Sequence, residues 1–470
     1  MCLSAYVVKK AKLMDIDISL SAANHAASSH LNIKMKIGSA LVAVSAFILV
    51  IGLFNQLYHP ALLIAFFTTA IAGSLLYTNG MYANTTAGIK NNGVMFKPIS
   101  SKGVSAWMLG IVLTLFYVLL YWYPQYLGLN EKGNTGLVHF FDPFSKIMSG
   151  KPASQWFVYG TFYTLCIILL GIKFIIKYRH SAYQIRRTIS VMFFQLVVAF
   201  TLPEILSSLN KPYNDFKNMW PLNYYFFFDW HIKDLLANGT FGIFILVWGI
   251  ALSFIISPIL TYFFGKRWYC SWVCGCGGLA ETAGDPFRHL SSKKMSAWKF
   301  ERYSVHSVLV FVVVMTALVL YTYFTGKSDV LFLNSFKVRE AYGFLIGAIF
   351  SGIIGVGFYP IMGSRVWCRF GCPMAAILGI QQKFFSRFRI TTNGSQCISC
   401  GNCSTHCEMG IDVRWYAQRG QDIVRSSCVG CGVCSAVCPR GVLKLENGPN
   451  KTKKLEGSVS YINGQFVIED

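Results

Sequence analysis

Eight apolar runs, each long enough to cross a lipid bilayer, constrain this chain more than any other feature of its sequence. The hydrocarbon core of a membrane is about 30 Å thick, a distance that takes roughly 20 apolar residues of α-helix. Backbone polar groups at that depth must bond to one another, so helices are expected. We expect transmembrane helices over residues 36–57, 60–77, 106–123, 155–176, 188–206, 240–264, 303–324 and 341–362.

Two places in this series allow another interpretation. The fifth run is interrupted by Gln195, Pro203 and Glu204. The first two runs are joined by so short a turn that a re-entrant pair stays open as an alternative. The outside segments 124–154 and 207–239 are rich in aromatic residues, which we expect to form an interfacial belt.

Composition and charge agree with a membrane protein. Charged residues make up only 13% of the chain, whereas soluble domains carry about 25%. With the N-terminus inside, the inside segments hold 32 Lys and Arg against 9 outside, which is the asymmetry of the positive-inside rule. We therefore expect a multi-pass protein of the bacterial inner membrane, in contact with lipid, with both termini cytoplasmic. The basic residues follow this topology, so no nucleic acid partner is expected.

An internal repeat carries four of the cysteines. Both copies read G-x-R-x-aromatic-C-x3-C, and both begin where an expected helix reaches the inner surface. The first copy holds Cys270 and Cys274, and the second holds Cys368 and Cys372. Residues four apart lie on one face of a helix, so each pair is expected to present its sulfurs together. Two converging pairs suit a third iron–sulfur cluster or a soft metal.

Three other residues of the repeat have open roles. Arg267 and Arg365 either stabilise the negative charge of such a site or bind lipid phosphate. Cys276 follows the first pair closely, and we expect it to be a bystander rather than a ligand.

Two runs of the form C-x2-C-x2-C-x3-C give the most specific pattern in the chain. In bacterial two-cluster ferredoxins the fourth cysteine of each run binds the other cluster. We therefore expect one [4Fe–4S] cluster on Cys397, Cys400, Cys403 and Cys438, and a second on Cys428, Cys431, Cys434 and Cys407. Gly401, Gly430 and Gly432 allow tight turns that aim N–H groups at sulfur. Structural zinc sites, the alternative, use C-x2-C pairs separated by a dozen or more residues.

These features predict a membrane all-α polytopic bundle of about eight transmembrane helices with a small C-terminal α+β two-cluster ferredoxin domain. Glu408 stands where proline is usual after the fourth cysteine, and the insert 409–427 is expected to be helical. The expected units are a cytoplasmic N-terminal segment 1–35, a six-helix region 36–264, a first cysteine loop 265–302, two helices 303–362, a second motif with a basic connector 363–392, the ferredoxin-like domain 393–446 and a tail 447–470.

The chain resembles the NosR/NapH family of polytopic iron–sulfur proteins. The resemblance rests on CSWVC at 270–274, CRFGCP at 368–373 and the segment 409–441, and it is specific from about residue 265 to 445. It implies a quinol-linked electron conduit, such as a quinol dehydrogenase subunit, that serves a periplasmic reductase for nitrous oxide or nitrate. The NosR branch usually has a periplasmic flavin-binding domain near its N-terminus. Nothing in this sequence corresponds to it, so no covalent flavin is expected.

Electron transfer between quinone and a periplasmic or membrane redox partner is thus the first expectation. Polar residues at membrane depth or in the outside loops are the candidates for quinone contact or proton transfer, namely Gln195, Glu204, His306 and His231. Their alternative role is to face lipid headgroups. A cytoplasmic copper reductase or maturation factor for a respiratory oxidase, with copper on the C-x3-C pairs, stays open. A redox-sensing regulator also stays open.

Overall fold

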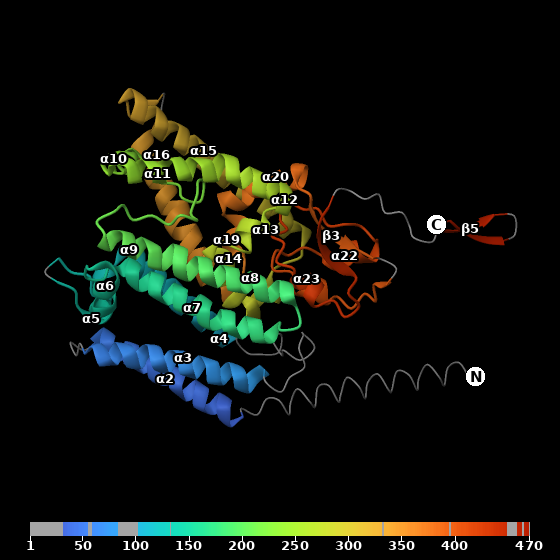
Figure 1. The fold of residues 1–470 in the computed structure, drawn as a ribbon, viewed down its shortest axis with the longest axis horizontal. Coiled ribbons are helices and arrows are strands. Elements are labelled where there is room, and N and C mark those ends of the chain that lie inside the picture. Colours follow the sequence, from blue (N-terminus) through green and yellow to red (C-terminus); the bar gives the residue numbers. More distant parts are fainter. Residues whose placement is uncertain are drawn as a thin grey trace.

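The computed structural model describes residues 32–54, 59–82, 102–131, 133–330, 333–393, 396–448, 458–462 and 465–469. Most of the expected N-terminal segment 1–35 lies outside these residues. The described chain forms a bundle of long helices with a smaller cysteine-rich head at one end (Figure 1).

Eight helices of the described chain are long and apolar enough to cross a membrane, which confirms the expected architecture. Each overlaps one of the expected apolar runs over most of its length. They are α2 (Ile33–Phe54), α3 (Pro60–Tyr82), α4 (Val104–Trp122), α7 (Gln155–Lys177), α8–η4–α9 (Ala182–Phe193, Phe194–Thr201, Leu202–Ser208), α11–η5–α12 (Gly239–Ala251, Leu252–Ile256, Ser257–Phe264), α15 (Met295–Thr325) and α16–η7–α17 (Ser335–Tyr342, Gly343–Ile354, Gly355–Gly357).

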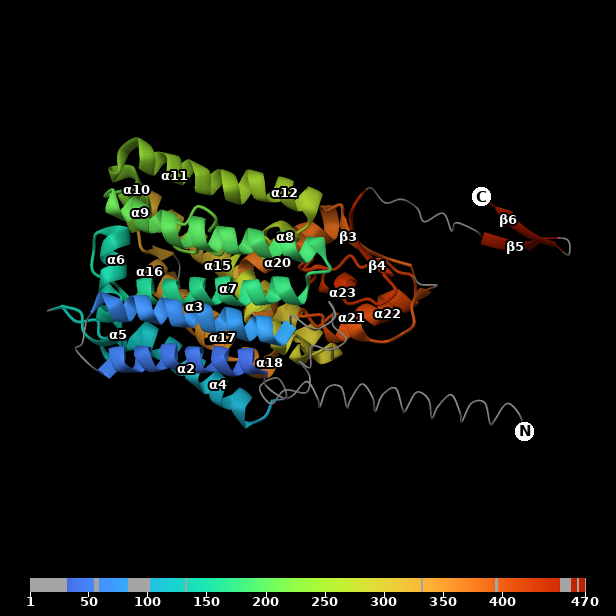
Figure 2. The same ribbon diagram turned by 60° about the horizontal axis from the view of Figure 1, so that its bottom comes forward.

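The first two helices form a close pair along the side of the bundle (Figure 2). A Cβ atom added to Gly38 would lie 2.5 Å from the backbone nitrogen of Tyr77, and one added to Gly73 would lie 2.9 Å from the carbonyl oxygen of Gly38. Glycine at these positions lets the two backbones touch. Both helices have full transmembrane length, which favours two separate crossings over the re-entrant alternative.

The interrupted fifth run is one continuous helix that widens at its centre. Residues Phe194–Thr201 form a π-helix, and the N–H of Leu202 bonds to the carbonyl of Val197, five residues earlier. Pro203 follows directly and has no N–H of its own, so a shift in the hydrogen-bond register accommodates it.

The end of the bundle opposite the head is built from short elements, and its aromatic residues are partly exposed, as at Tyr126, Tyr213 and Trp230, and partly buried. Phe226 and Phe228 are buried, and Phe226 packs against Gly249 of α11. The expected belt is therefore wrong for these two rings, because they fill the space between helix ends. The elements here include η3 (Pro124–Leu127), α5 (Gly136–Phe140), α6 (Asp142–Ser149) and α10 (Asp229–Ala237), and β1 (Asp329–Val330) and β2 (Leu333–Asn334) join α15 to α16.

The head contains a two-stranded antiparallel sheet and three short helices. Its strand β3 (Phe388–Thr392) pairs with β4 (Leu443–Asn447) and begins before the expected domain start at residue 393. The insert is helical only over α22, which is shorter than expected. The head helices are α21 (Asn402–Thr405), α22 (Val413–Gln418) and α23 (Val433–Ala436), and a separate hairpin joins β5 (Ser458–Ile462) to β6 (Gln465–Glu469).

Short helices lie between the bundle and the head (Figure 1). They are α13 (Arg267–Cys270), α14 (Gly275–Thr282), η6 (Asp285–Leu290), α18 (Tyr359–Met362), α19 (Val366–Phe370) and α20 (Pro373–Phe385). They carry both copies of the cysteine repeat.

Candidate metal centres

The two copies of the C-x3-C repeat have the same backbone geometry. In each copy the first cysteine belongs to a short helix, and the second lies in extended backbone just before the next helix. The N–H of Cys274 donates to the carbonyl of Tyr269 at 2.8 Å, and the N–H of Cys372 donates to that of Trp367 at 3.0 Å. The expectation that each cysteine pair lies on one face of a continuous helix is therefore wrong. In the second copy Pro373 drives the preceding residue out of the helical region.

The four cysteines of the repeat (Cys270, Cys274, Cys368 and Cys372, the repeat quartet) are nonetheless brought together. All four are buried in one hydrophobic cluster, and each is at most 8% exposed. Burial raises the pKa of the Cys270 thiol to about 12 because the thiolate is poorly solvated there. Thiolates at this place therefore need positive charge beside them.

Arg365 supplies part of that charge. Its guanidinium is buried, donates to the carbonyl of Cys270 at 3.1 Å and lies 3.8 Å from the sulfur of Cys368. The alternative role of Arg365, binding to lipid phosphate, is therefore wrong. The other arginine of the repeat, Arg267, lies over the ring of Phe388 in the head, 4.6 Å from its centroid.

Lys266 is a second buried cation beside the cysteines. It is 1% exposed, and no carboxylate lies within ion-pair distance of its ammonium in the part of the chain that the structure describes. Its charge acts on the thiols of Cys270 and Cys428. A buried ammonium without a carboxylate is costly, so an anionic centre on these cysteines is the partner that its position suits.

The eight cysteines of the head surround two small cavities. One is lined by Cys397, Cys400, Cys403 and Cys438, which we call the outer quartet. The other is lined by Cys407, Cys428, Cys431 and Cys434, which we call the inner quartet. Each quartet takes three cysteines from one run and the fourth from the other run, which is the interleaved order of two-cluster ferredoxins.

The two halves of the head are close structural copies. Left-handed backbone occurs at Ser399 and Gly401 in the first half and at the equivalent Gly430 and Gly432 in the second. These turns direct backbone N–H groups at sulfur, so that the N–H of Gly430 bonds to Cys428. Four thiols around each cavity, with backbone N–H groups donating to sulfur, are the surroundings that suit a [4Fe–4S] cubane.

Side chains of the bundle hold the loop of the inner quartet. Four successive carbonyls, from Cys428 to Cys431, each accept a hydrogen bond from outside the head. The donors are Gln382 to Cys428 at 2.8 Å, Ser271 to Val429 at 2.8 Å, Tyr183 to Gly430 at 2.8 Å and Gln184 to Cys431 at 2.9 Å. These contacts fix the inner quartet against the bundle, while Cys400 of the outer quartet is exposed on the head.

A buried network of charges also joins the head to the bundle. Glu408 accepts from Arg288 at 2.7 Å and pairs with Arg365 at 2.9 Å. Burial alone would raise the pKa of Glu408, but these arginines hold it below its ordinary value. Glu281 extends the network by pairing with Arg187 and Arg365. The feature of the sequence that points to this network is Glu408, which follows the fourth cysteine of the first run, where proline is usual.

The inner quartet lies between the other two cysteine groups, so we describe the three as a row: Ser271, next to Cys270, donates to the carbonyl of Val429, next to Cys428, and the inner and outer quartets share the two cysteine runs of the head. Arg365 is within electrostatic reach of Cys270 and Cys368 in the repeat quartet and of Cys431 in the inner quartet. Cys434 of the inner quartet is in turn influenced by Cys403 of the outer quartet. The row runs from the edge of the bundle to the exposed side of the head.

Cys276 lies closer to the repeat quartet than the sequence suggests. A hydrogen bond from its thiol holds the pKa of Cys274 below its ordinary value. In the second copy the equivalent position is Met374, so the symmetry of the repeat does not require a fifth sulfur.

One cavity of about 240 Å³ lies beside the repeat quartet, between α15 and α20. We call it the head-end cavity. Its lining includes Lys266, Trp298, His306, Cys368, Ala376 and Phe384. It therefore brings a residue of the repeat quartet to the same space as a histidine expected to contact quinone.

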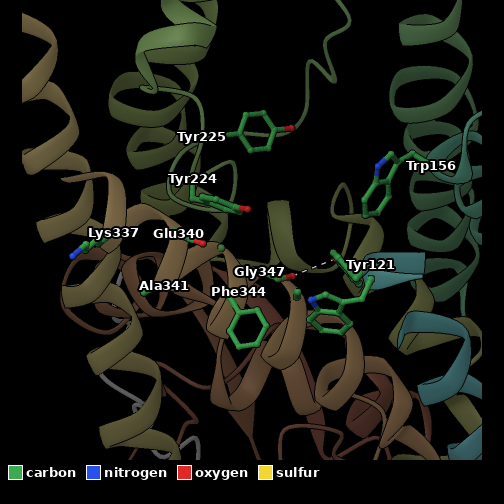
Figure 3. Close-up of a pocket in the computed structure, with 12 residues that line it drawn as sticks. Tyr121, Trp156, Tyr224, Tyr225, Lys337, Glu340, Ala341, Phe344 and Gly347 are labelled. Carbon is green, nitrogen blue, oxygen red and sulfur yellow. Dashed lines mark hydrogen bonds between the residues drawn. The ribbon is translucent and has the colours of Figure 1, made fainter. Parts of the chain in front are cut away.

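A larger cavity of about 900 Å³ lies at the opposite end of the bundle, and we call it the far cavity. Half of its lining residues are aromatic, namely Tyr121, Trp122, Trp156, Tyr224, Tyr225 and Phe344 (Figure 3). The hydroxyl of Tyr121 donates to the carbonyl of Gly347 at 3.3 Å.

A column of tyrosine rings leads from the far cavity to the first cysteine loop. From Tyr121 the column passes to Tyr117, Tyr159 and Tyr163, with successive ring centroids 6.4, 5.8 and 5.5 Å apart. Tyr163 lies against Gly275, directly after Cys274. Unlike the head-end cavity, the far cavity has no cysteine in its lining.

The four polar residues expected to contact quinone do not form one site. The Gln195 amide donates to Thr164 at 3.2 Å and lies next to Gly275. Glu204 on α9 and His231 on α10 lie toward the end opposite the head (Figure 1). His306 on α15 is the one of the four that lines the head-end cavity.

Comparison with known proteins supports the metal chemistry of these segments. Residues 389–439 match the family described as a 4Fe-4S dicluster domain. Residues 241–295 and 342–391 both match the family described as a 4Fe-4S binding domain, which agrees with the internal repeat.

Two curated proteins are similar to parts of the chain. "Putative electron transport protein YccM" of Escherichia coli K12 is 25% identical over 170 residues, which is 34% of this chain and 46% of the relative. "Uncharacterized protein MJ0749" of Methanocaldococcus jannaschii is 26% identical over 165 residues, or 34% of this chain and 58% of the relative. The chain thus spans about half the length of the curated relatives it matches, and no solved structure matches it. It carries 4Fe-4S ferredoxin-type domains on a multi-pass helical scaffold and is similar to iron–sulfur electron-transfer proteins.

Proposed function

We propose that this chain is a membrane-bound iron–sulfur protein that passes electrons between the quinone pool and a redox partner protein. The outer and inner quartets would each hold one [4Fe–4S] cluster, and the repeat quartet would hold a third cluster. The observation that carries the proposal is the row of three cysteine groups, each buried or cradled by backbone N–H groups.

The surroundings of the row suit negatively charged centres. Cluster-bound thiolates carry negative charge, and bound clusters supply one-electron transfer at low potential. Lys266 and Arg365 place two buried cations at the repeat quartet, and Arg365 also reaches the inner quartet. These residues stabilise the charge, and the apolar cluster around the sulfurs excludes water.

The partner side of the row is the outer quartet. Cys400 is exposed, so a redox protein that docks on the head would approach this quartet most closely. The positive-inside distribution supports a cytoplasmic head in the bacterial inner membrane. The resemblance to the NosR/NapH family favours a periplasmic reductase for nitrous oxide or nitrate as the final acceptor, reached through a further redox protein on the outer face.

The test is reduction of the clusters by a quinol. The full chain is purified anaerobically, and its visible absorbance is followed after addition of menadiol or decylubiquinol, with dithionite as the reference reductant. We expect the quinol to bleach a large part of the absorbance that dithionite bleaches. Bleaching by dithionite with no response to either quinol would remove quinone from the proposal. Protein without iron would overturn the proposal as a whole.

A further inference from the structure

We propose that the head-end cavity is the binding site for the ring of a lipid-soluble quinone. This inference rests on the proposed electron-transfer function and locates its membrane substrate. The cavity holds about 240 Å³, which suits a head group of one or two rings rather than a drug-sized ligand.

The position of the cavity favours a redox ligand. Cys368 of the repeat quartet is part of the lining, so a bound ring would contact the residue that holds the nearest redox centre. The far cavity lacks this contact because its lining contains no cysteine.

Exposed aromatic side chains beside the cavity point to entry from lipid. Phe300 and Tyr303 on α15 are 60% and 74% exposed, and Phe384 and Phe385 on α20 are 66% and 68% exposed. Large exposed rings at the end of a transmembrane helix are typical of the membrane interface. A ligand with a hydrocarbon tail can therefore place its ring in the cavity and leave its tail among the lipids.

Polar groups in the lining match the two oxygens of a quinone. Lys266 offers a buried ammonium that no carboxylate in the described chain neutralises. His306 donates from Nδ1 to the carbonyl of Arg302 at 2.6 Å, which leaves its Nε2 as an acceptor in the neutral ring. Glu301 also lines the cavity, but Arg369 and Ser427 occupy both of its oxygens.

These groups have distinct roles in quinol oxidation. A quinol that becomes a quinone loses two electrons and two protons as its two O–H bonds break. The electrons pass singly to the iron–sulfur centres of the proposed function. His306 accepts each proton at Nε2 and, because it is only half-buried, releases it to water at the surface of the bundle. Lys266 donates to the ring oxygen and stabilises its negative charge.

A matched pair of substitutions tests the site. Ala376 lines the head-end cavity and Ala348 lines the far cavity, and both are buried, at 3% and 6% exposed. We expect Ala376→Phe to slow bleaching by menadiol at least tenfold while the dithionite-reduced spectrum stays unchanged. Ala348→Phe should leave both unchanged. Slowing by Ala348→Phe alone would assign the quinone to the far cavity and overturn the inference. Normal rates of bleaching in both variants would also overturn the inference.

Photolabelling gives a readout that does not depend on turnover. An azido-naphthoquinone is irradiated with the purified chain in vesicles of phosphatidylethanolamine and phosphatidylglycerol, and the labelled peptides are identified by mass spectrometry. We expect label on the α15 segment around Trp298 and His306, competed by menadione and lost in Ala376→Phe. Label on the peptides around Tyr224 or Phe344, or label competed only by added phosphatidylglycerol, would contradict a quinone site here.

His306→Gln separates proton transfer from binding. Glutamine keeps a polar side chain but does not take up a proton. We expect the maximal rate of menadiol oxidation to fall about tenfold or more while photolabelling and the KM for menadiol stay near their original values. An unchanged maximal rate would remove His306 from its proposed role.

Discussion

Glu408 of the head forms a buried ion pair with Arg365 of the second cysteine loop, 2.9 Å apart. Glu408 directly follows Cys407, and Arg365 reaches the backbone and sulfur of the repeat quartet. One ion pair thus connects the segment that carries the inner quartet to the segment that carries the repeat quartet. The distance between these two cysteine groups is therefore set by a rigid contact and not by a linker.

Loss of this carboxylate should destabilise the junction of head and bundle. Removing one member of a buried pair costs about 3–5 kcal/mol when its partner is left unpaired. In Glu408→Gln, Arg288 keeps Asp285 and Arg365 keeps Glu281, so we expect a loss at the lower end of that range or below it. We expect a lower unfolding midpoint in detergent and earlier release of the head by protease. Glu446→Gln, at an exposed carboxylate on β4, is the control and should change stability by less than about 0.5 kcal/mol. Equal midpoints for the two variants would contradict the structural role of Glu408.

The left-handed turns of the head predict unequal effects at equivalent positions. Gly430 has φ of +62°, and a Cβ added there would lie 2.6 Å from Cβ of Arg267. Gly430→Ala should therefore cost about 1–2 kcal/mol from backbone strain alone, with more from the clash. Ser399 has the same kind of backbone at φ of +57°, so in Ser399→Gly the relief of this strain offsets the lost hydrogen bond from Gln418, and the net change in stability should be near zero. Thermal unfolding of both variants would reveal the difference, and equal losses would contradict it.

The symmetry of the repeat predicts which sulfur of the first loop is a ligand. Cys274 corresponds to Cys372, with the same capping position and the same hydrogen bond, whereas Cys276 corresponds to Met374. We expect Cys276→Ser to keep the iron content and Cys274→Ser to lose about four iron atoms per chain, the content of one cubane. Iron analysis of both variants tests this. Loss of iron from Cys276→Ser but not from Cys274→Ser would make Cys276 the ligand and Cys274 the bystander.

The charge of Lys266 should raise the reduction potential of the neighbouring centres. A nearby cation favours the reduced state, which is the more negative one. Lys266→Met should lower the midpoint potential by roughly 60 mV for each 1.4 kcal/mol of lost stabilisation. Lys444→Met, at an exposed lysine on β4, should leave the potential unchanged. A redox titration followed by EPR measures both midpoint potentials. An unchanged potential in Lys266→Met would show that the charge of this lysine does not act on the redox centres.

The buried carboxylate of Asp285 predicts where stability depends on pH. Burial alone would raise its pKa, but Lys177 and Arg288 hold the pKa well below its ordinary value. A depressed pKa stabilises the folded state at every pH above the ordinary value of about 3.9, and that contribution is lost only as the pH falls below it. The gap in unfolding midpoint between the original chain and Asp285→Asn should thus stay constant from pH 8 to about pH 5. If the difference in unfolding midpoint disappears near pH 6, the ion pairs of Asp285 do not stabilise the folded chain in the way proposed.

The general architecture could be predicted because its determinants are local or periodic. Apolar runs define helices on their own, so even the run broken by Pro203 is a continuous span with a π-helical centre. The spacing of the eight ferredoxin cysteines groups them in the same fours that line the two head cavities. Their role as ligands stays a prediction.

The contacts that assemble the candidate site could not be predicted in the same way. Gln184 and Ser271 donate to carbonyls of the head more than 150 residues away in the chain, and single polar residues at helix ends form no pattern. The C-x3-C spacing suggests a continuous helix, but extended backbone at Cys274 and Cys372 places the sulfurs differently. Lys266 looks like an ordinary lysine at the membrane surface until its burial beside Cys270 and Cys428 is seen.

The most direct test of the proposed function is EPR spectroscopy with iron and sulfide analysis on the anaerobically purified full chain. Three cubanes correspond to about twelve iron and twelve sulfide per chain, four of each for every [4Fe–4S] cluster. We expect these values together with signals of interacting reduced clusters, because the three cysteine groups lie in a row. About eight iron would leave the repeat quartet without a cluster. Colourless protein with no iron, or with zinc in its place, would contradict electron transfer by this chain.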